Sequence, residues 1–369
     1  PRGEASAARF GGITLTATVM ITTGGSGGHV FPGLAVAHTL RALGAGVFWL
    51  GTRDGIESRL VPQHGVDFEG LDFRGVRGKG LRTLFLGPLA LAAACVASRR
   101  VLRRRKPDVV PGFGGFASFP GALMTAATRR PLLLHEANAI AGLANRILAY
   151  GADRICVGFP DAFRGRHRRI VEFTGNPLRD DITSLPAPGA RFAGRDGPLR
   201  LLVVGGSLGA QALNALVPAA LARIDAAARP QVVHQSGARH LEALAAAYAR
   251  HGVQGECVAF IDDMAARYAW ADYVICRGGA LTVAELAAVG LGSLIVPLPG
   301  AIADEQTANA RYLVDAGAAT CVQQDRLDAA TLAAAIAGMT RDRALALATK
   351  ARAVGRNDAA ARIAALCLA

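Results

Sequence analysis

The feature of this sequence that most constrains its fold is a glycine-rich turn that directly follows a short apolar run. Residues 24–29 read Gly-Gly-Ser-Gly-Gly-His, after the apolar run at residues 19–23. A second turn of this kind, Gly-Gly-Ser at residues 205–207, follows the apolar run at residues 201–204. Glycine between a buried strand and a helix allows backbone N–H groups and the positive end of the helix dipole to approach a phosphate. Two such turns predict two nucleotide-type domains facing each other, and group transfer between phosphate-bearing substrates.

Chain length and composition agree with two globular α/β domains. The chain has 369 residues, and two domains of roughly 150 to 180 residues are the usual solution at such a length. Hydrophobic residues make up 51% and charged residues 19%, which excludes a disordered chain or a coiled coil. The net charge of +13 indicates an anionic partner, which from charge alone is nucleic acid, an anionic membrane surface or a phosphorylated substrate.

Apolar β-rich runs alternate with helical patterns in both halves, which predicts an α/β fold with a parallel sheet, covered on both faces, in each domain. The helix after the first glycine turn is expected to start near Pro32. The predicted strands are residues 19–23, 47–50, 108–110, 132–135, 155–157 and 171–174 in the first half, and residues 201–204, 232–235, 258–261, 273–276, 293–297 and 319–322 in the second.

The domain organisation follows from turn formers and from the apolar C-terminal segment. Residues 1–17 lack an apolar stretch of signal-peptide length and are expected to be a disordered leader. Turn formers cluster near residue 176, so we expect an N-terminal domain of residues 18–175 and a C-terminal domain of residues 176–354. The helix expected at residues 355–369 is apolar and needs a surface to cover. We expect it to pack back on the N-terminal domain.

Neither the cysteines nor the acidic residues indicate a metal site. The six cysteines are scattered without the close spacing of a zinc knuckle or a redox pair, which favours free thiols in a reducing cytosol. No Asp-x-Asp follows a predicted strand, and we expect no metal and no cofactor.

The segment at residues 85–105 has two interpretations. An apolar run at residues 84–97, about 14 residues long against the roughly 20 needed to span a bilayer, is followed at once by a cluster of arginines. It is either a core helix with a solvated basic end or an apolar patch that lies on anionic headgroups.

Short strings along the chain together resemble one family. They are residues 24–37, 50–52, 77–80, 114–116, 135–138, 175–177, 205–207, 260–264, 279–285 and 306–310. Their order and spacing resemble the MurG family, the UDP-N-acetylglucosamine:lipid I N-acetylglucosaminyltransferases of bacterial peptidoglycan synthesis. The resemblance implies a GT-B fold of two Rossmann-like domains and inverting transfer to the 4-hydroxyl of the N-acetylmuramyl-pentapeptide of lipid I, giving lipid II. It also implies a peripheral enzyme at the cytoplasmic face of the inner membrane.

The resemblance assigns the UDP-N-acetylglucosamine site to the C-terminal domain. It implies that Glu285 accepts the ribose hydroxyls and that Ile261 offers its backbone to the uracil. The residues it places near the diphosphate or the sugar are Arg179, Ser207, Ala280, Leu281, Thr282 and Gln306. Six positions depart from the family pattern. Leu208 and Ala137 each replace a usual Gln, Gly278 a usual Ser, Phe116 a frequent Tyr and Gly300 a frequent His, and Glu305 stands where His or Gln is usual.

The resemblance also implies that the N-terminal domain is the acceptor and membrane-associating domain. It places the acceptor diphosphate over residues 24–28, including Ser26, Gly27 and Gly28, with Asn138 and Asn214 near the reacting centre. His29 is the predicted base, because an imidazole with a pKa near 6.5 suits removal of the acceptor proton. The predicted catalytic residues are thus His29, Asn138 and Glu285. The His135-Glu136 pair is either structural or functional.

Other functions fit part of the pattern. Another GT-B enzyme of UDP-sugars, such as a diacylglycerol glycosyltransferase or a UDP-sugar 2-epimerase, shares the paired turns. A nicotinamide enzyme requires Gly-x-Gly-x-x-Gly and an acid about 20 residues later, which this chain does not provide. A basic membrane-binding or nucleic-acid-binding module explains the charge but not the two glycine turns, and with 6% aromatic residues there is little stacking surface. The expected partners therefore include an anionic membrane surface but no nucleic acid.

Overall fold

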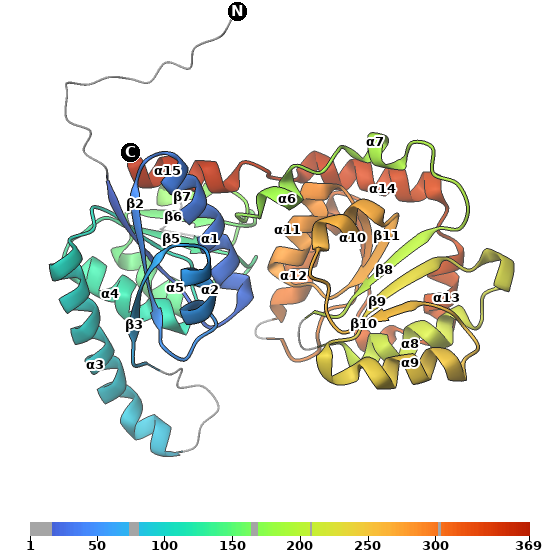
Figure 1. The fold of residues 1–369 in the computed structure, drawn as a ribbon, viewed down its shortest axis with the longest axis horizontal. Coiled ribbons are helices and arrows are strands. Elements are labelled where there is room, and N and C mark those ends of the chain that lie inside the picture. The colour runs from blue at the N-terminus through green and yellow to red at the C-terminus, as the bar shows by residue number, and fades with distance from the viewer. Residues whose placement is uncertain (1–16, 74–80, 164–168, 207–208, 302–303) are drawn as a thin grey trace, which may run out of the picture.

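The chain folds into two α/β domains, each built on a parallel sheet (Figure 1). The computed structural model describes residues 17–73, 81–163, 169–206, 209–301 and 304–369, and for residues 81–86 the backbone alone. The first domain has a seven-stranded sheet in the order β3-β2-β1-β4-β5-β6-β7, and the second a six-stranded sheet in the order β10-β9-β8-β11-β12-β13. The paired strands run parallel. The prediction of two doubly wound domains is confirmed.

The elements of the first domain alternate strand and helix along the chain. Its strands are β1 (Thr18–Thr22), β2 (Gly46–Thr52), β3 (Asp67–Leu71), β4 (Val110–Gly112), β5 (Leu132–Glu136), β6 (Arg154–Val157) and β7 (Val171–Phe173). Its helices are α1 (Gly27–Ala42), α2 (Glu57–Gln63), α3 (Leu81–Arg105), α4 (Phe119–Ala127) and α5 (Leu143–Leu148).

The second domain repeats this alternation. Its strands are β8 (Arg200–Val204), β9 (Gln231–Gln235), β10 (Glu256–Val258), β11 (Tyr273–Cys276), β12 (Gly292–Ile295) and β13 (Ala319–Cys321). The helices that follow β7 are α6 (Asp180–Thr183), α7 (Pro188–Phe192), α8 (Gln211–Leu221), α9 (Leu241–Arg250), α10 (Met264–Trp270), α11 (Ala280–Val289), α12 (Glu305–Asp315), α13 (Ala329–Ala337), α14 (Arg341–Val354) and α15 (Ala359–Leu368).

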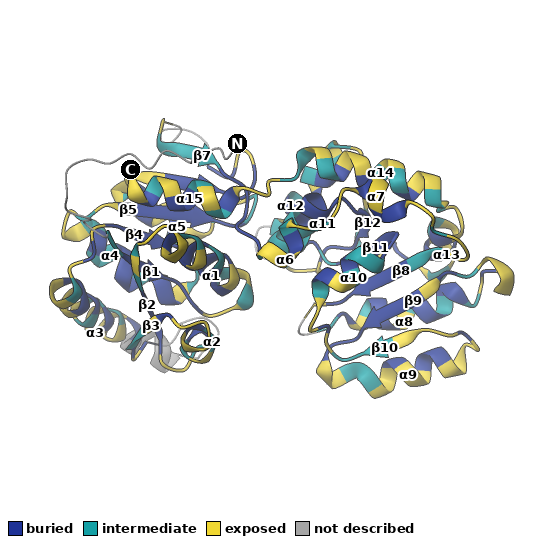
Figure 2. Cartoon of the chain, turned by 45° about the horizontal axis from the view of Figure 1, so that its top comes forward, coloured by how far each residue is buried: buried dark blue, intermediate teal, exposed yellow. Residues whose placement is uncertain are grey.

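Both faces of the first sheet are buried, as Figure 2 shows by the dark strands between their helices. Successive side chains of a strand point to opposite faces. Accordingly, Val19 and Ile21 pack with α1, whereas Met20 packs on the other face with α3 and α4. Burial on both faces explains why most strands read as continuous apolar runs.

The sequence did not predict β3, and it misplaced several element boundaries. Strand β3 lies at the sheet edge and carries Asp67 and Glu69, which pair with arginines at the end of α3. Charged residues are tolerated on an edge strand, so an apolar pattern is absent there. Strand β4 lies about two residues later than predicted, and β10 about two residues earlier.

The expectation that the first helix starts near Pro32 was wrong. Helix α1 begins at Gly27, with Ser26 as its N-cap, and Pro32 lies within the helix. Proline is common at the first position of a helix, so Pro32 led to a predicted helix start that is too late. The glycines themselves form the first turn, so the N-terminus of α1 lies within the predicted phosphate-binding turn.

The two domains are joined by two neighbouring chain crossings. The chain enters the second domain after β7 and returns to the first domain after α14. The two crossing segments touch, because a Cβ added to Gly175, whose φ is +84°, would lie 2.5 Å from the Cβ of Arg356 on the returning segment. Helix α15 then lies on the first domain beside α1, where Ile363, Ala364 and Cys367 enter its core (Figure 1).

Candidate functional site

The first glycine turn places the N-terminus of α1 at the carboxyl end of β1. Ser26 has an extended backbone, with φ −151° and ψ 158°, and ends the turn as the N-cap of α1. Its Oγ lies 2.9 Å from Nδ1 of His29, one turn into the helix. The first N–H groups of a helix have no carbonyl partner within the helix, so this terminus offers donors and a positive dipole end to an anion.

A buried carboxylate stabilises this turn by a hydrogen bond from its backbone. The side chain of Glu57, at the start of α2, is wholly buried and accepts a hydrogen bond from the backbone N–H of Gly25 at 3.1 Å. Its other oxygen accepts from the N–H and the hydroxyl of Thr52, at 3.0 and 2.7 Å. A Cβ added to Gly24 would lie 2.1 Å from this carboxylate. Glycine is therefore required at that position by close approach.

A second pair of glycines, after β4, packs against the same turn. A Cβ added to Gly115 would lie 2.2 Å from the carbonyl oxygen of Gly24, and one added to Gly114 would lie 3.0 Å from the ring of His29. The imidazole of His29 therefore packs against the backbone of Gly114 and is half-buried. Burial lowers the pKa of His29 below its usual value of 6.5. The ring is neutral at physiological pH.

The loop after β5 is held by Glu136, which is itself buried. Glu136 accepts hydrogen bonds from the N–H groups of Asn138 and Gly142, each at 3.0 Å, and from the side-chain amide of Asn145 at 2.9 Å. Burial raises the pKa of Glu136, and these hydrogen bonds oppose the rise. Burial also lowers the pKa of the neighbouring His135 to about 4. Both side chains lie inside the domain, and Glu136 positions the loop that carries Asn138.

Asn309 on α12 joins this loop to the second domain. Its side-chain oxygen accepts from the N–H of Ala139 at 2.8 Å, and its amide nitrogen donates to the side-chain oxygen of Asn138 at 3.2 Å and to the carbonyl of Gly278 at 3.1 Å. Asn309 is wholly buried. One amide therefore contacts the predicted acceptor loop of the first domain and the segment that starts α11 in the second.

The start of α11 packs tightly against α12. A Cβ added to Gly278 would lie 2.4 Å from the carbonyl oxygen of Gln306, which excludes a side chain at this position in the present backbone. The side chain of Gln306 accepts from the N–H groups of Gly278 and Leu298, at 3.1 and 2.9 Å. Gln306 thus fixes the segment leading to Ala280, where the helix begins, followed by Leu281 and Thr282.

Glu285 lies on α11, one turn beyond this start, next to a buried tyrosine. The hydroxyl of Tyr268 donates to its carboxylate at 2.9 Å. Burial raises the pKa of Glu285 to about 7, while Tyr268 and the charge of Arg179 oppose the rise. Arg179 pairs with Asp181 at 3.2 Å and is partly exposed. Ile261 lies on the same side of the domain core as Tyr268.

Asn214 and the second glycine turn lie within the second domain. The amide of Asn214 donates to the carbonyl of Ser236 at 3.1 Å, and its oxygen lies 3.1 Å from Nε2 of His234. A Cβ added to Gly209 would lie 2.2 Å from that same carbonyl of Ser236. Asn214 therefore stabilises the second glycine turn from within the second domain. Ser207 and Leu208 lie outside the described residues.

Over the described ranges, no cluster of three or more His, Cys, Asp and Glu side chains is arranged to hold a metal ion.

Comparison with known proteins agrees with this geometry. Residues 19–157 match the glycosyltransferase family 28 N-terminal domain, and residues 200–364 match the glycosyltransferase family 28 C-terminal domain. The UDP-N-acetylglucosamine–N-acetylmuramyl-(pentapeptide) pyrophosphoryl-undecaprenol N-acetylglucosamine transferase of Aromatoleum aromaticum is 54% identical over 95% of this chain and 97% of its own. The enzyme of the same name from Nitrosospira multiformis is 51% identical over 96% of this chain and 99% of its own.

A solved structure leads to the same family. The crystal structure of Acinetobacter baumannii MurG has a TM-score of 0.81 and 36% identity, covering 95% of this chain and 99% of that one. The chain belongs to the MurG family. The resemblance inferred from its motifs is confirmed, and so is the GT-B fold.

Three side chains of this MurG-family site were not predicted. Glu57 follows the matched string at residues 50–52, and Tyr268 lies before β11, but neither stands next to a glycine turn in sequence. Asn309 belongs to a matched string, yet only the structure shows its contact with Asn138. An acid at the start of a helix that follows a strand was the available signal for Glu57. The other two depend on tertiary contacts.

Replacing Glu57 by Gln is expected to destabilise the first domain by about 2 to 3 kcal/mol. The variant places an amide N–H₂ group against backbone and hydroxyl donors, so buried hydrogen bonds to a charged acceptor are lost. Urea unfolding followed by the fluorescence of Trp49, in a Trp270→Phe background, measures this loss. The exposed Glu242→Gln is the matched control, with no expected change. Equal stability of the two variants would show that Glu57 does not hold the turn.

Proposed function

We propose that this chain transfers N-acetylglucosamine from UDP-N-acetylglucosamine to the 4-hydroxyl of the N-acetylmuramyl-pentapeptide of lipid I, giving lipid II for peptidoglycan synthesis. The observation that carries the proposal is the contact that Asn309 makes across the domains, between the loop that carries Asn138 and the segment that starts α11. This contact places the predicted acceptor loop of the first domain next to the N-terminus of α11, and a helix N-terminus is suited to bind the diphosphate of the donor. The names of the MurG relatives supply the two substrates.

The donor is assigned to the second domain. The carboxylate of Glu285 accepts hydrogen bonds from the two ribose hydroxyls, and the backbone of Ile261 faces the uracil. The diphosphate lies at the N-terminus of α11, over Ala280, Leu281 and Thr282, with Arg179 adding positive charge. Ser207 belongs to this diphosphate site by family resemblance. A helix terminus stabilises the charge that grows on the departing diphosphate.

The acceptor is assigned to the first domain, with its diphosphate over residues 24–28. The 4-hydroxyl oxygen attacks the anomeric carbon from the face opposite the leaving group. As that bond forms, the bond from the anomeric carbon to the diphosphate oxygen breaks, and its electron pair leaves with UDP. Nε2 of His29 takes the hydroxyl proton, while Nδ1 donates to Oγ of Ser26, which holds the ring in the required tautomer. The sugar is transferred with inversion.

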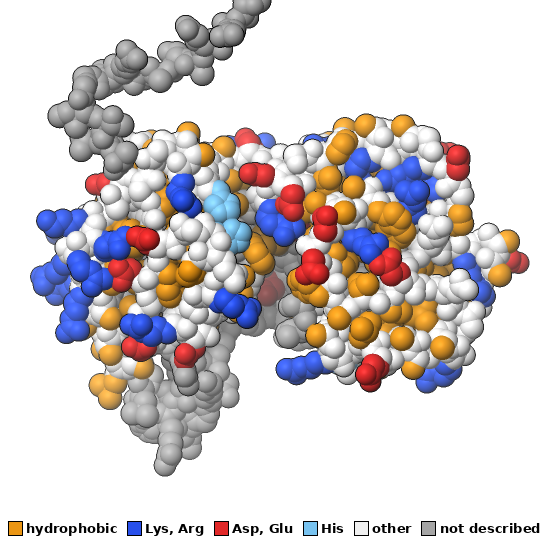
Figure 3. Space-filling model, in the orientation of Figure 1, with side chains coloured by type: hydrophobic (Ala, Val, Ile, Leu, Met, Phe, Trp, Pro, Cys, Tyr) orange, Lys and Arg blue, Asp and Glu red, His pale blue; other side chains and the backbone are white. Residues whose placement is uncertain are grey.

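Peripheral binding to the cytoplasmic leaflet is assigned to α3. Leu89 and Val96 lie two helical turns apart and are 69% and 51% exposed, and the exposed Arg99, Arg100 and Arg103 continue towards the end of the helix. Figure 3 shows Lys and Arg side chains gathered at the edge of the first domain over this helix. No helix in the described part of the chain is long and apolar enough to cross a bilayer. The apolar side chains enter the interface and the arginines bind anionic headgroups.

The His29→Ala variant is expected to lower turnover by about 10²- to 10⁴-fold, because no group then removes the acceptor proton. Transfer from radiolabelled UDP-N-acetylglucosamine to a short-chain lipid I analogue measures it. Affinity for UDP, bound in the other domain, should stay unchanged. Since burial lowers the pKa of His29, the acidic limb of kcat should lie below pH 6.5. A wild-type enzyme that transfers no sugar would overturn the proposed function, and normal turnover of the variant would overturn the role of His29.

Affinity for UDP-N-acetylglucosamine is expected to weaken roughly tenfold from pH 8 to pH 6. The pKa of Glu285 is about 7 in the free protein, so the carboxylate that accepts the ribose hydroxyls is protonated below that pH. The diphosphate diester of UDP-N-acetylglucosamine does not titrate between pH 6 and pH 8, so the charge of the ligand stays constant. Titration calorimetry at each pH measures the affinity. Glu285→Gln should bind more weakly and with little pH dependence. A wild-type affinity that is flat with pH would contradict the assignment.

Binding to vesicles that contain anionic lipid is expected to fall as salt rises, because charges on α3 are screened within about 8 Å at physiological ionic strength. Sedimentation with the vesicles measures the bound fraction. The pair Leu89→Ser/Val96→Ser should remove the binding that survives at high salt. The pair Leu43→Ser/Ile56→Ser is the control, since both residues are exposed and cap α1 and α2, which lie on the opposite face of the sheet. Equal binding by the two pairs would exclude α3 as the docking face.

A further inference from the structure

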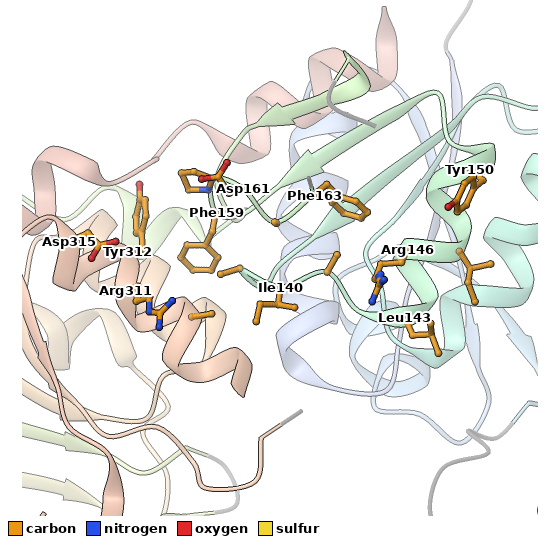
Figure 4. Close-up of a pocket in the computed structure, with 16 residues that line it drawn as sticks. Ile140, Leu143, Arg146, Tyr150, Phe159, Asp161, Phe163, Arg311, Tyr312 and Asp315 are labelled. Atoms are coloured by element: carbon orange, nitrogen blue, oxygen red, sulfur yellow. The ribbon is translucent and has the colours of Figure 1, made fainter. Parts of the chain in front are cut away.

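A groove of about 1050 Å³ lies between the two domains, with walls formed by α5 and α12. Figure 4 shows Ile140 between these walls, with Arg311 and Tyr312 on the α12 side and Leu143 and Arg146 on the α5 side. Its volume is at the upper end of the range for small-molecule pockets. None of the residues that line it is among the predicted donor- or acceptor-binding residues, although Ala139 belongs to the loop that Asn309 contacts.

The groove shares its walls with the candidate active site. Asn138 and Asn309 hydrogen-bond to each other at the site, and their chain neighbours Ala139 and Ala308 line the groove. A Cβ added to Gly114 would lie 3.0 Å from the ring of His29 and 3.7 Å from the amide nitrogen of Asn145. Asn145 directly precedes Arg146, which lines the groove. The groove therefore begins beside the glycine turn assigned to the acceptor diphosphate.

The α5 wall of the groove exposes large apolar side chains. Leu143 is 67% exposed, Ile147 48% and Ile140 38%. Leu143 and Ile147 lie four residues apart and so share one face of the helix. Clustered apolar side chains of this kind mark a surface that binds an apolar partner. Helix α5 packs on α4, which packs on α3, so this wall belongs to the same layer as Leu89 and Val96.

Each wall of the groove also carries a cation. Arg146 comes from α5 and Arg311 from α12, and among the described residues neither guanidinium has an ion-pair partner. The acids Asp161 and Asp315 also line the groove, but the structure shows no ion pair between them and these arginines. Apolar side chains next to two arginines complement a ligand with a hydrocarbon chain attached to an anionic group. A polyprenyl diphosphate has this composition.

We propose that the groove between α5 and α12 binds the first isoprenoid units of the lipid-linked acceptor, next to its diphosphate. The proposal rests on the proposed function, because it uses the acceptor of that reaction. Ile140, Leu143 and Ile147 contact the chain as it leaves the site, and Arg146 and Arg311 face the diphosphate end. The chain then continues into the bilayer on the side of α3. The groove thus selects for the lipid of the acceptor, in addition to the sugar and the peptide.

Two soluble acceptor analogues test the proposal, with the same sugar, peptide and diphosphate but with two or four isoprenoid units. Transfer is measured without vesicles and below the micelle concentration of either analogue. The wild-type enzyme should show a KM for the longer analogue about tenfold lower, because more apolar surface is buried. Leu143→Ser/Ile147→Ser should abolish that preference while leaving the affinity for UDP-N-acetylglucosamine unchanged. Arg146→Gln, which changes no packed side chain, should raise the KM for both analogues.

The matched control is Leu89→Ser/Val96→Ser on α3, which should keep the full chain-length preference. If the wild-type enzyme transfers sugar to both analogues with equal KM, or if the α5 pair keeps the preference, the groove proposal is overturned while the proposed function stands. Loss of the preference in the α3 pair instead would show that α3, and not the groove, contacts the chain. A wild-type enzyme that glycosylates neither analogue would overturn the proposed function itself.

Discussion

The arrangement of the site depends on the single buried amide of Asn309. It holds the loop of Asn138 in the first domain and the carbonyl of Gly278 in the second, so the two domains meet where the loop after β5 approaches the start of α11. An amide suits this position because it both donates and accepts, and neither partner is left buried without a hydrogen bond. The tight contact of Gly278 with Gln306 leaves the same junction without room for a side chain.

The glycine turn and the Asn138 loop of the first domain are each supported by a buried acid. Glu57 holds the backbone of Gly25, and Glu136 holds the loop of Asn138. Glycines permit close approach but impose no conformation, since they are the most permissive residues. The buried carboxylates supply the constraint that the glycines lack. They also occupy inward-facing donors, while the donors at the start of α1 remain available to a ligand.

The sequence predicted the two sheets, most strands and the family, because apolar runs and glycine turns are local signals. It did not predict β3, whose charged residues reflect an edge position that only the assembled sheet defines. It also started α1 too late, since Pro32 resembled a first-turn proline. In the site, the contacts of Glu57 with Gly25, of Tyr268 with Glu285 and of Asn309 with Asn138 span 32, 17 and 171 residues, so no spacing rule connects them. The resemblance assigned Asn214 to the reacting centre, and the structure shows its hydrogen bonds to Ser236 and His234 within the second domain.

The pKa shifts in the two domains have opposite consequences for the proposed reaction. Burial lowers the pKa of His29, so the base gains its proton only below its usual value of 6.5. Burial raises the pKa of Glu285 to about 7, so the carboxylate assigned to the ribose hydroxyls becomes fully charged only above neutral pH. Donor binding therefore responds to pH before the chemical step does, and kcat/KM for the donor falls at a higher pH than kcat. Because the two groups lie in different domains and titrate in different ranges, their effects on the rate are separable by varying the donor concentration.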